Sequence, residues 1–360
     1  MPRKIIFLLV ILLVAFSTTG CISFKKKTVA VGDLGGIFVS DNRIESWSHK
    51  SNIMTPGETP GSLAGVNVNF IKYDSQADEA LYAGTDDGLY YSYGNFLKNG
   101  KIADGWLKSR TLPEGNIGGF AIDSKNKCVL YAGVLRDLYK STDCGRTWIR
   151  KFTSDGENRR ITALAIDWYE PKVLYMGLED GTLLKSEDNG ESWKNVYEFK
   201  NQVAKVIVDP NNSFNVYVAE SPGGLRKSVD KGINWSNFDT LMKDYRDFKN
   251  YYNFDVSTEP KDIILYACEE GILRSKDGGE TWTKVELTTQ TGQKIIYALT
   301  IDPTDANKIY YATDVALYKT IDGGVNWANK RMETTRVARD LVVHPKRPGT
   351  IYMGVKTLNK

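Results

Sequence analysis

Histidine is nearly absent from this 360-residue chain, which contains only His49 and His344. Two isolated imidazoles argue against a histidine-dependent catalytic site and against a His-rich metal site. Excess charge is also scarce, because 47 Lys and Arg residues stand against 44 Asp and Glu residues, for a net charge of +3. A nucleic-acid-binding surface normally shows basic clusters and a high pI. We therefore expect no metal, no cofactor and no nucleic-acid partner.

The N-terminal apolar run is too short for a membrane-spanning helix. It covers residues 5–16, whereas a helix needs about 20 residues to cross a bilayer. Arg3 and Lys4 precede the run, and small residues lead from it to Cys21. A basic start, an apolar centre and a small-residue end are the layout of an export signal. We therefore expect residues 1–21 to be a targeting segment.

This segment resembles a bacterial lipoprotein signal, because Gly20 directly precedes Cys21. The match has one departure, since Thr18 stands where a leucine is usual. An ordinary membrane anchor, or a signal cleaved elsewhere, are the alternatives. The resemblance implies lipidation at Cys21, a tether over residues 22–34, and attachment of the exported protein to the bacterial cell envelope through its lipid anchor. Ile22 is compatible with sorting to the outer membrane or the cell surface.

Three further cysteines are present. Cys128 opens a predicted hairpin and Cys144 lies just past its returning strand, so the two thiols could face each other. An exported chain meets an oxidising compartment. We therefore name Cys128 and Cys144 as a candidate disulfide, with two free thiols as the alternative, because an offset of one residue would spoil the geometry. Cys268 lies within a predicted strand and is interpreted as a small buried residue.

An eight-residue marker, [ST]-x-D-x-G-x-[STN]-W, recurs along the chain. Complete copies cover residues 141–148, 186–193, 228–235, 275–282 and 320–327. A degenerate copy over residues 40–47 has Asn42 in place of Asp and Ile44 in place of Gly. A second phrase, an apolar residue followed by Tyr and small residues, occurs seven times, at Tyr82, Tyr131, Tyr175, Tyr217, Tyr266, Tyr310 and Tyr352.

The repeat length predicts the fold. Successive tryptophans from Trp106 to Trp327 are 42, 45, 42, 47 and 45 residues apart, which is the period of a four-stranded propeller blade. The first unit, residues 35–47, supplies only the last two strands of a blade, and the last unit, residues 341–354, supplies only the first two. We therefore predict an all-β fold, a seven-bladed β-propeller of four-stranded antiparallel blades closed by a composite N- and C-terminal blade. Residues 35–360 would form one domain, expected to be a monomer.

The marker resembles the Asp-box, or bacterial neuraminidase repeat, over residues 35–354. Its Ser or Thr and its Asp can bind backbone N–H groups of the turn, its Gly permits a positive φ, and its Trp packs between blades. In families that carry it, the box lies on the turn between the third and fourth strands, away from the ligand site. We therefore interpret the box aspartates as structural rather than catalytic or calcium-binding: Asp143, Asp188, Asp230, Asp277 and Asp322.

Several families share this architecture, so the fold alone does not decide the function. Sialidases carry an Arg-Ile-Pro motif, but here Arg160 and Ile161 are followed by Thr162. Xyloglucan-hydrolysing enzymes of this type use a cleft between two propellers, and sortilin-type receptors have a larger ring and cysteine-rich modules. In size, blade count and lipoprotein signal the chain resembles the photosystem II assembly and stability factors most closely. The resemblance implies an architecture.

The face opposite the boxes is the candidate binding face, because its residues do not repeat from blade to blade. We expect acidic hairpins to surround a basic and aromatic inner ring whose candidate residues are Arg160, Lys205, Arg246, Tyr252, Tyr297 and Arg339. Aromatic rings would stack on a ligand, and guanidinium groups would hold carboxylates. The alternative for each residue is a solvated rim position.

These observations favour a membrane-anchored lipoprotein that acts as a non-catalytic binding or assembly scaffold for protein segments or glycans. The alternative is a glycoside hydrolase of the sialidase or xyloglucanase kind, whose two carboxylates would lie about 5 to 9.5 Å apart. Glu269 with Asp314, or Asp340 with an acidic hairpin residue, are the candidate pairs.

Overall fold

The structure is a computed structural model, and it describes residues 32–54, 61–74, 76, 80–92, 105–156, 159–288 and 295–358. The predicted signal, Cys21 and the tether up to residue 31 lie outside these residues. Gly32 forms a bridge with Thr334, and the Thr334 hydroxyl donates to the Leu34 carbonyl at 2.6 Å. The last residues of the predicted tether therefore lie against the folded domain.

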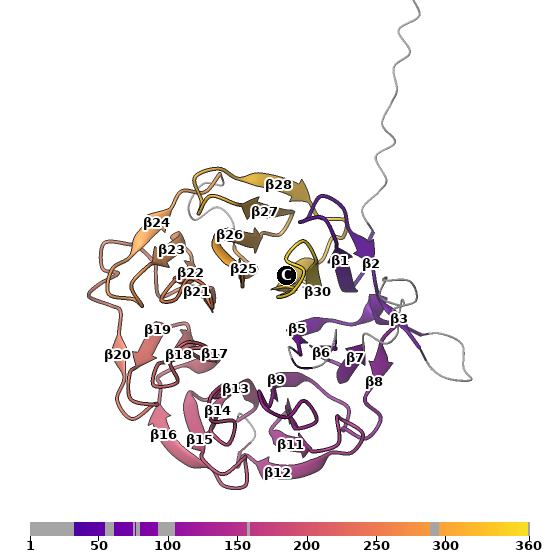
Figure 1. The fold of residues 1–360 in the computed structure, drawn as a ribbon. Helices are drawn as coiled ribbons and strands as arrows, with labels where there is room; N and C mark the ends of the chain where they lie inside the picture. Colours follow the sequence, from indigo (N-terminus) through magenta and orange to yellow (C-terminus); the bar gives the residue numbers. More distant parts are fainter. Residues whose placement is uncertain are drawn as a thin grey trace, which may run out of the picture. The chain divides into compact units, whose positions relative to one another are not determined.

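Seven four-stranded antiparallel sheets form a ring (Figure 1), as the repeat length predicts. Blade 1 comprises β5 (Val68–Tyr73), β6 (Leu81–Thr85), β7 (Leu89–Ser92) and β8 (Leu107–Lys108). Blade 2 comprises β9 (Ile117–Ile122), β10 (Leu130–Val134), β11 (Asp137–Ser141) and β12 (Ile149–Thr153). Blade 3 comprises β13 (Ile161–Ile166), β14 (Leu174–Leu178), β15 (Thr182–Ser186) and β16 (Lys194–Glu198).

The remaining blades follow in chain order. Blade 4 comprises β17 (Gln202–Val208), β18 (Val216–Ser221), β19 (Gly224–Ser228) and β20 (Ser236–Asn237). Blade 5 comprises β21 (Tyr251–Val256), β22 (Ile264–Cys268), β23 (Gly271–Ser275) and β24 (Thr283–Val285). Blade 6 comprises β25 (Ala298–Asp302), β26 (Asp305–Ala312), β27 (Ala316–Thr320) and β28 (Ala328–Arg331). A short hairpin, β3 (Asn52–Ile53) with β4 (Gly61–Ser62), and a 3-10 turn over Leu63–Gly65 precede blade 1.

The seventh blade is the predicted composite. Its order is β2 (Ser48–His49), β1 (Gly36–Ser40), β30 (Ile351–Lys356) and β29 (Val337–Val343). In register, β30 pairs with β1 from Gly36 opposite Val355 to Ser40 opposite Ile351, and it pairs with β29 on its other side. The last strand of the chain thus lies between the first and the penultimate, which closes the ring and leaves no open sheet edge there.

Burial follows the position of each strand within its blade. The Tyr strands β6, β10, β14, β22 and β30 are buried along nearly their whole length, because both of their faces pack on neighbouring blades. The outer strands β12, β16 and β28 are largely exposed. The core is divided into seven apolar clusters, and each joins residues of adjacent blades, as Tyr175 of blade 3 packs with Val218 of blade 4. Each blade therefore depends on its neighbours for its core.

The Asp-box turns form the hydrogen bonds that their sequence predicts. In the box at residues 141–148, the Ser141 hydroxyl accepts from the N–H of Gly145 at 2.9 Å, and Asp143 accepts from the N–H of Thr147 at 2.9 Å and its hydroxyl at 2.6 Å. Gly145 has φ of +81°. The degenerate copy folds alike, since Ser40 accepts from the N–H of Ile44 at 2.9 Å. The amide oxygen of its Asn replaces the carboxylate as acceptor.

Candidate functional site

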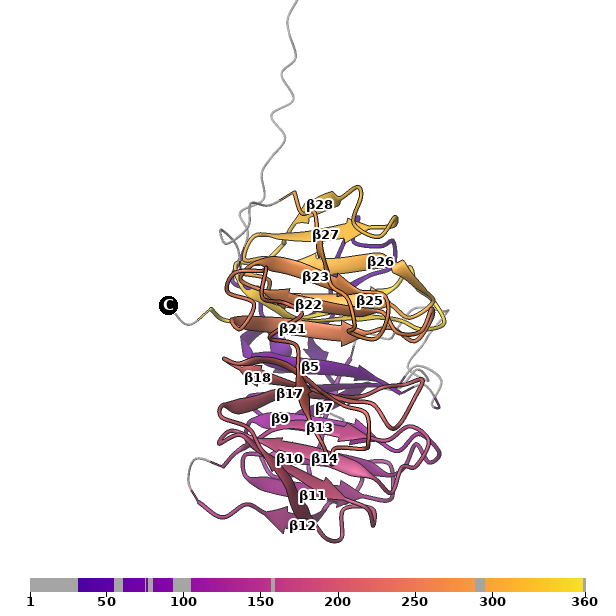
Figure 2. The same cartoon turned by 90° about the vertical axis from the view of Figure 1, so that its left-hand side faces the viewer.

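The two faces of the disc are assigned by the direction of the strands. Each inner strand runs from the candidate face to the face that carries the boxes, across the disc seen edge-on in Figure 2. The boxes lie beside the turns that connect first and second strands, as the N–H of Asn189 donates to the carbonyl of Lys172 and the N–H of Gly278 to that of Asp262. We call this side the box face. The six candidate residues belong to the other side or to the channel in the centre of the ring.

Lys205 lies in the wall of the central channel rather than on the open face. Its ammonium donates to the Asn253 side chain at 3.1 Å and to the Phe254 carbonyl at 2.6 Å. Burial lowers the pKa of Lys205, although the carboxylates of Asp255 and Asp340 act in the opposite direction. Alternate side chains of an inner strand point into the channel, so one in the middle of the strand faces the inner strands of other blades rather than the solvent above the ring.

Asp340 is, with Asp255, one of two carboxylates whose charge acts on this lysine. Lys205 pairs with Ala219 and Asp340 with Gly354, each two residues after the repeated Tyr. Asp340 accepts from the N–H of Ile71 at 2.7 Å and from that of Leu341 at 3.1 Å. Burial raises its pKa, against the lowering effect of the Ile71 N–H and of nearby cations. Asp340 therefore links the composite blade to blade 1.

Arg339 and the two tyrosines lie toward the candidate face. Arg339 is exposed, and its charge acts on Lys205 and Tyr251. Tyr252 and Tyr297 are half-buried at the beginning of adjacent inner strands, and they are close enough for Tyr297 to raise the pKa of Tyr252, after burial and Glu269. Arg339 and Lys205 thus lie within electrostatic range of each other along the channel, and Tyr252 and Tyr297 form a separate pair at the start of adjacent inner strands.

Arg160 and Arg246 lie apart from this group in the contacts that they make. Arg160 is exposed and its guanidinium is 3.8 Å from Glu179 of the adjacent hairpin. Arg246 is exposed in the connection between β20 and β21. Glu269 belongs to the candidate acid pair Glu269 with Asp314. It accepts a hydrogen bond from the Asn250 amide at 2.5 Å. These residues form the rim of the candidate face.

The sequence reasoning missed three channel residues, namely Lys72, Asn253 and Asp255. Asp255 accepts from the N–H of Ile301 at 3.0 Å, which joins blades 5 and 6. A signal was available, because a polar residue inside an inner strand that is otherwise apolar marks a side chain facing the channel. Assigning it required the phase of each strand, which bulges alter in β5, β17, β21 and β29.

The five box carboxylates have tasks within their own turns. Hydrogen bonds from the turn lower the pKa of Asp143, Asp188, Asp230 and Asp322 to about 2. At Asp277 burial is the largest single effect and raises the pKa, but the hydrogen bonds of the turn together outweigh it and hold the pKa at about 2. In the described part of the chain, no three His, Cys, Asp or Glu side chains gather in a way that could hold a metal ion.

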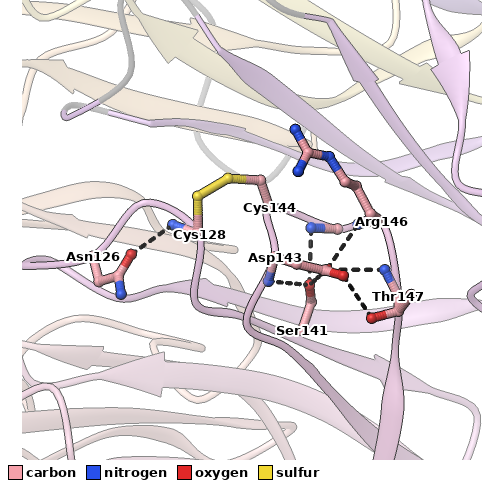
Figure 3. The surroundings of a disulfide bond; sticks show 8 residues. Asn126, Cys128, Ser141, Asp143, Cys144, Arg146 and Thr147 are labelled. Atoms are coloured by element: carbon pink, nitrogen blue, oxygen red, sulfur yellow. Dashed lines mark hydrogen bonds between the residues drawn. A yellow bond between two sulfur atoms is a disulfide. The ribbon is translucent and has the colours of Figure 1, made fainter.

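A disulfide joins Cys128 and Cys144 on the box face (Figure 3). Cys128 lies in the turn before β10, and Cys144 occupies the positive-φ position of the box turn, with φ of +62°. The N–H of Cys144 donates to the carbonyl of Cys128 at 3.0 Å. The bond therefore ties a box to the neighbouring turn of its own blade. Cys268 is a buried free thiol whose pKa burial raises to about 12.

Comparison with known proteins relates the chain to several propeller families. The family model described as "Sortilin, neurotensin receptor 3" matches residues 181–285. A xyloglucanase of Paenibacillus sp is 24% identical over 307 residues, which is 68% of this chain and 29% of that protein. The photosystem II assembly lipoprotein Ycf48 of Synechococcus sp. (strain CC9902) is 27% identical over 184 residues, 51% of this chain and 53% of that protein.

Solved structures show the same fold. The GH74 enzyme of Niastella koreensis superposes with a TM-score of 0.62 at 16% identity, over 80% of this chain and 51% of that one. The chain thus spans less than a third of the xyloglucanase and about half of the GH74 enzyme. Within the described residues we find no helix with the length and apolarity needed to cross a bilayer.

Proposed function

We propose that the protein acts on a polysaccharide, which it holds across the candidate face. The observation that carries the proposal is the Tyr252–Tyr297 pair, two half-buried rings at the start of adjacent inner strands. A tyrosine ring offers an apolar face to the C–H surface of a sugar and a hydroxyl to its oxygens. The xyloglucanase relative supports a glycan over a protein segment as the ligand, and makes xyloglucan the first polysaccharide to test.

Hydrolysis of the bound glycan is the second candidate function, and the names of the relatives support it more than they support a non-catalytic scaffold. A glycosidase acid needs a raised pKa and a second carboxylate about 5 to 9.5 Å away. Burial raises the pKa of Asp340, and Asp255 is the other carboxylate that acts on Lys205. Both Asp340 and Asp255 accept backbone hydrogen bonds between blades. This structural task favours binding as the primary activity.

One experiment tests both activities. The full chain in detergent is titrated with xyloglucan oligosaccharide in a calorimeter, and the release of reducing ends is followed in the same samples. We expect the double variant Tyr252→Ala, Tyr297→Ala to bind at least about tenfold more weakly, equivalent to ~1.4 kcal/mol. Tyr169→Ala, an exposed tyrosine on the box face, is the matched control and should bind normally. Asp340→Asn should abolish any reducing-end release.

The outcomes separate the candidates. Binding without release of reducing ends supports a glycan-binding module, and release that Asp340→Asn abolishes supports a hydrolase. The glycan proposal is wrong if no glycan binds and the native protein retains envelope proteins that the double variant does not retain. The ligand is then a protein segment.

We also propose that the protein is exported and anchored by a lipid on Cys21. The layout of residues 1–21 and the disulfide at Cys128 support export, and the name of the Synechococcus relative includes "lipoprotein". Membrane fractionation of Cys21→Ala should move the protein from the membrane to the soluble fraction. Retention of that variant in the membrane would exclude a lipid on Cys21 as the anchor.

A further inference from the structure

A cavity lies at the opposite end of the channel from the candidate face. It has a volume of about 250 Å³. Four consecutive inner strands, β5, β9, β13 and β17, supply its walls, with apolar side chains that include Ala121, Ile122, Ala165, Ile166, Ile207 and Val208. The ends of these strands and Trp168 of the following turn place its mouth on the box face.

The register explains why space remains there. Lys72, Ala121, Ala165 and Ile207 each pair with the repeated Tyr of their blade, so the four lie at one height in the channel. Two of them are alanines on adjacent strands, and their short side chains leave room that larger residues would fill. Ala165 and Ile207 are half-buried, so apolar surface faces the cavity and is open to water. Covering it with an apolar ligand is favourable.

Lys72 supplies a positive charge in the same wall. Its side chain is exposed, and it forms no ion pair in the described part of the chain. Lys205 and Arg339 lie further along the channel, where their charges act together with that of Lys72. Asp74 also lines the cavity, but it is 2% exposed and accepts from the Gln76 N–H. Of the charged residues that line the cavity, Lys72 is therefore the exposed one, and its charge also acts on the Asp340 carboxylate further along the channel.

Two polar side chains of the wall already donate to backbone carbonyls. The Gln76 amide donates to the carbonyl of Asp123. The Ser124 hydroxyl already donates to the Trp168 carbonyl at 2.5 Å, which fixes the turn that carries the indole. Trp168 is 48% exposed at the mouth. A sugar needs several hydrogen-bonding partners on entering a cavity. This largely apolar wall with the Lys72 ammonium therefore suits a ligand that is more apolar than a sugar.

We propose that this cavity binds an amphipathic anion, an apolar chain that ends in a carboxylate. The chain would lie against the alanines and Val208, and the carboxylate would pair with the Lys72 ammonium. A cavity of roughly 150 Å³ holds benzene, so 250 Å³ suits a medium-length chain better than a long lipid tail. The site lies on the face opposite the proposed glycan surface, and its occupancy does not depend on the glycan function.

The test is a calorimetric titration of the full chain in a buffer without detergent, at a protein concentration below the aggregation limit. Octanoate is the probe, and 1-octanol is its neutral counterpart. We expect saturable octanoate binding and at least about tenfold weaker binding of octanol, because a charge-assisted contact is lost. Lys72→Gln should weaken octanoate binding about tenfold. Ala165→Leu, which fills the cavity, should abolish it. Lys276→Gln, an exposed lysine of a box turn, is the control and should bind normally.

Two results would overturn the proposal: no saturable octanoate binding to the native protein, or octanoate affinities of Lys72→Gln and Ala165→Leu within twofold of native. If Ala165→Leu fails to fold, as seen by circular dichroism, Lys72→Gln alone decides. The Tyr252→Ala, Tyr297→Ala variant should keep its octanoate affinity, which separates this site from the glycan surface.

Discussion

At the scale of single residues, two chemically different side chains accept the same backbone hydrogen bonds in equivalent turns of two blades. After the inner strand of blade 2, Asp123 accepts hydrogen bonds from the N–H groups of Lys125 and Asn126 at 2.7 and 3.0 Å. In the composite blade His344 takes this place, and its Nδ1 accepts from the N–H groups of Lys346 and Arg347 at 3.1 Å each. Burial and the adjacent Arg347 lower the pKa of His344 to about 4.

The lowered pKa predicts a histidine-dependent loss of stability in mild acid. Above pH 6.5 the imidazole is neutral in both folded and unfolded chains, and its stabilising effect is complete. As the pH falls from 6.5 to about 4, the unfolded chain binds the proton and the folded chain does not, so the free energy of unfolding decreases. We expect His344→Asp, which introduces the residue that blade 2 has at this place, to remove this decrease. Thermal unfolding between pH 8 and pH 4 measures it.

His344→Ala is the companion variant. It removes the side-chain acceptor of two partly buried N–H groups, so it should lower the free energy of unfolding at pH 7 by ~0.5–1.5 kcal/mol. If His344→Asp retained the full native pH dependence between 6.5 and 4, other groups would be its source and the assignment to His344 would fail.

At the scale of elements, the disulfide adds a covalent tie where the other blades use hydrogen bonds alone. In blade 3 the box turn contacts the preceding turn through the N–H of Asn189 and the carbonyl of Lys172. Blade 2 keeps the equivalent contact between Cys144 and Cys128 and adds the bond between their sulfur atoms. The Cys pair therefore uses a geometry that the repeat already supplies.

Removing the bond should destabilise the domain without changing its fold. The cysteines are 16 residues apart, and closing a loop of this length stabilises by ~3 kcal/mol in the chain-entropy model. We expect Cys128→Ser with Cys144→Ser to lower the free energy of unfolding by about this amount, as chemical denaturation would measure. Cys268→Ala is the control that removes a free thiol. The unreduced protein can be unfolded, treated with an alkylating agent and weighed by intact mass spectrometry. Alkylation of both Cys128 and Cys144 would contradict the bond.

At the scale of the whole molecule, stability depends on closing the ring. Strand β30 pairs with β1 from the beginning of the described chain and with β29 near its end. The core of the composite blade includes Phe38 from β1 and Met353 from β30 in one cluster. Because each apolar cluster joins neighbouring blades, opening one junction exposes apolar surface on both sides of it.

Truncation after His344 should therefore unfold the domain cooperatively. It removes β30, leaves β29 without a partner and β1 with β2 alone, and so creates new sheet edges. Circular dichroism should show loss of the native thermal transition. Truncation after Lys356, which keeps all of β30, is the matched control and should melt close to the native temperature. A native-like transition in the shorter variant would show that closure is dispensable.

The fold was predictable because its signals are local and repeated. Seven Tyr phrases and regular Trp spacing predict seven sheets, and the incomplete first and last units predict the composite blade, which the structure contains. The candidate site was harder to predict. Lys205 was expected on the open face, and Lys72 was not singled out, because bulges change the side to which an inner-strand residue points. Register within a curved sheet depends on neighbouring strands rather than on the sequence of one strand.

The sequence alone determined the blade number, the closing blade and the turns of the Asp-boxes, since each depends on residues close together in the chain. Only the tertiary structure decided which side chains meet in the channel. Asp340 and Ile71 are bonded although 269 positions separate them, and the cavity beside Lys72 is built from four blades. Such contacts arise where seven separate strands converge on one axis, and no local pattern contains the distances between them.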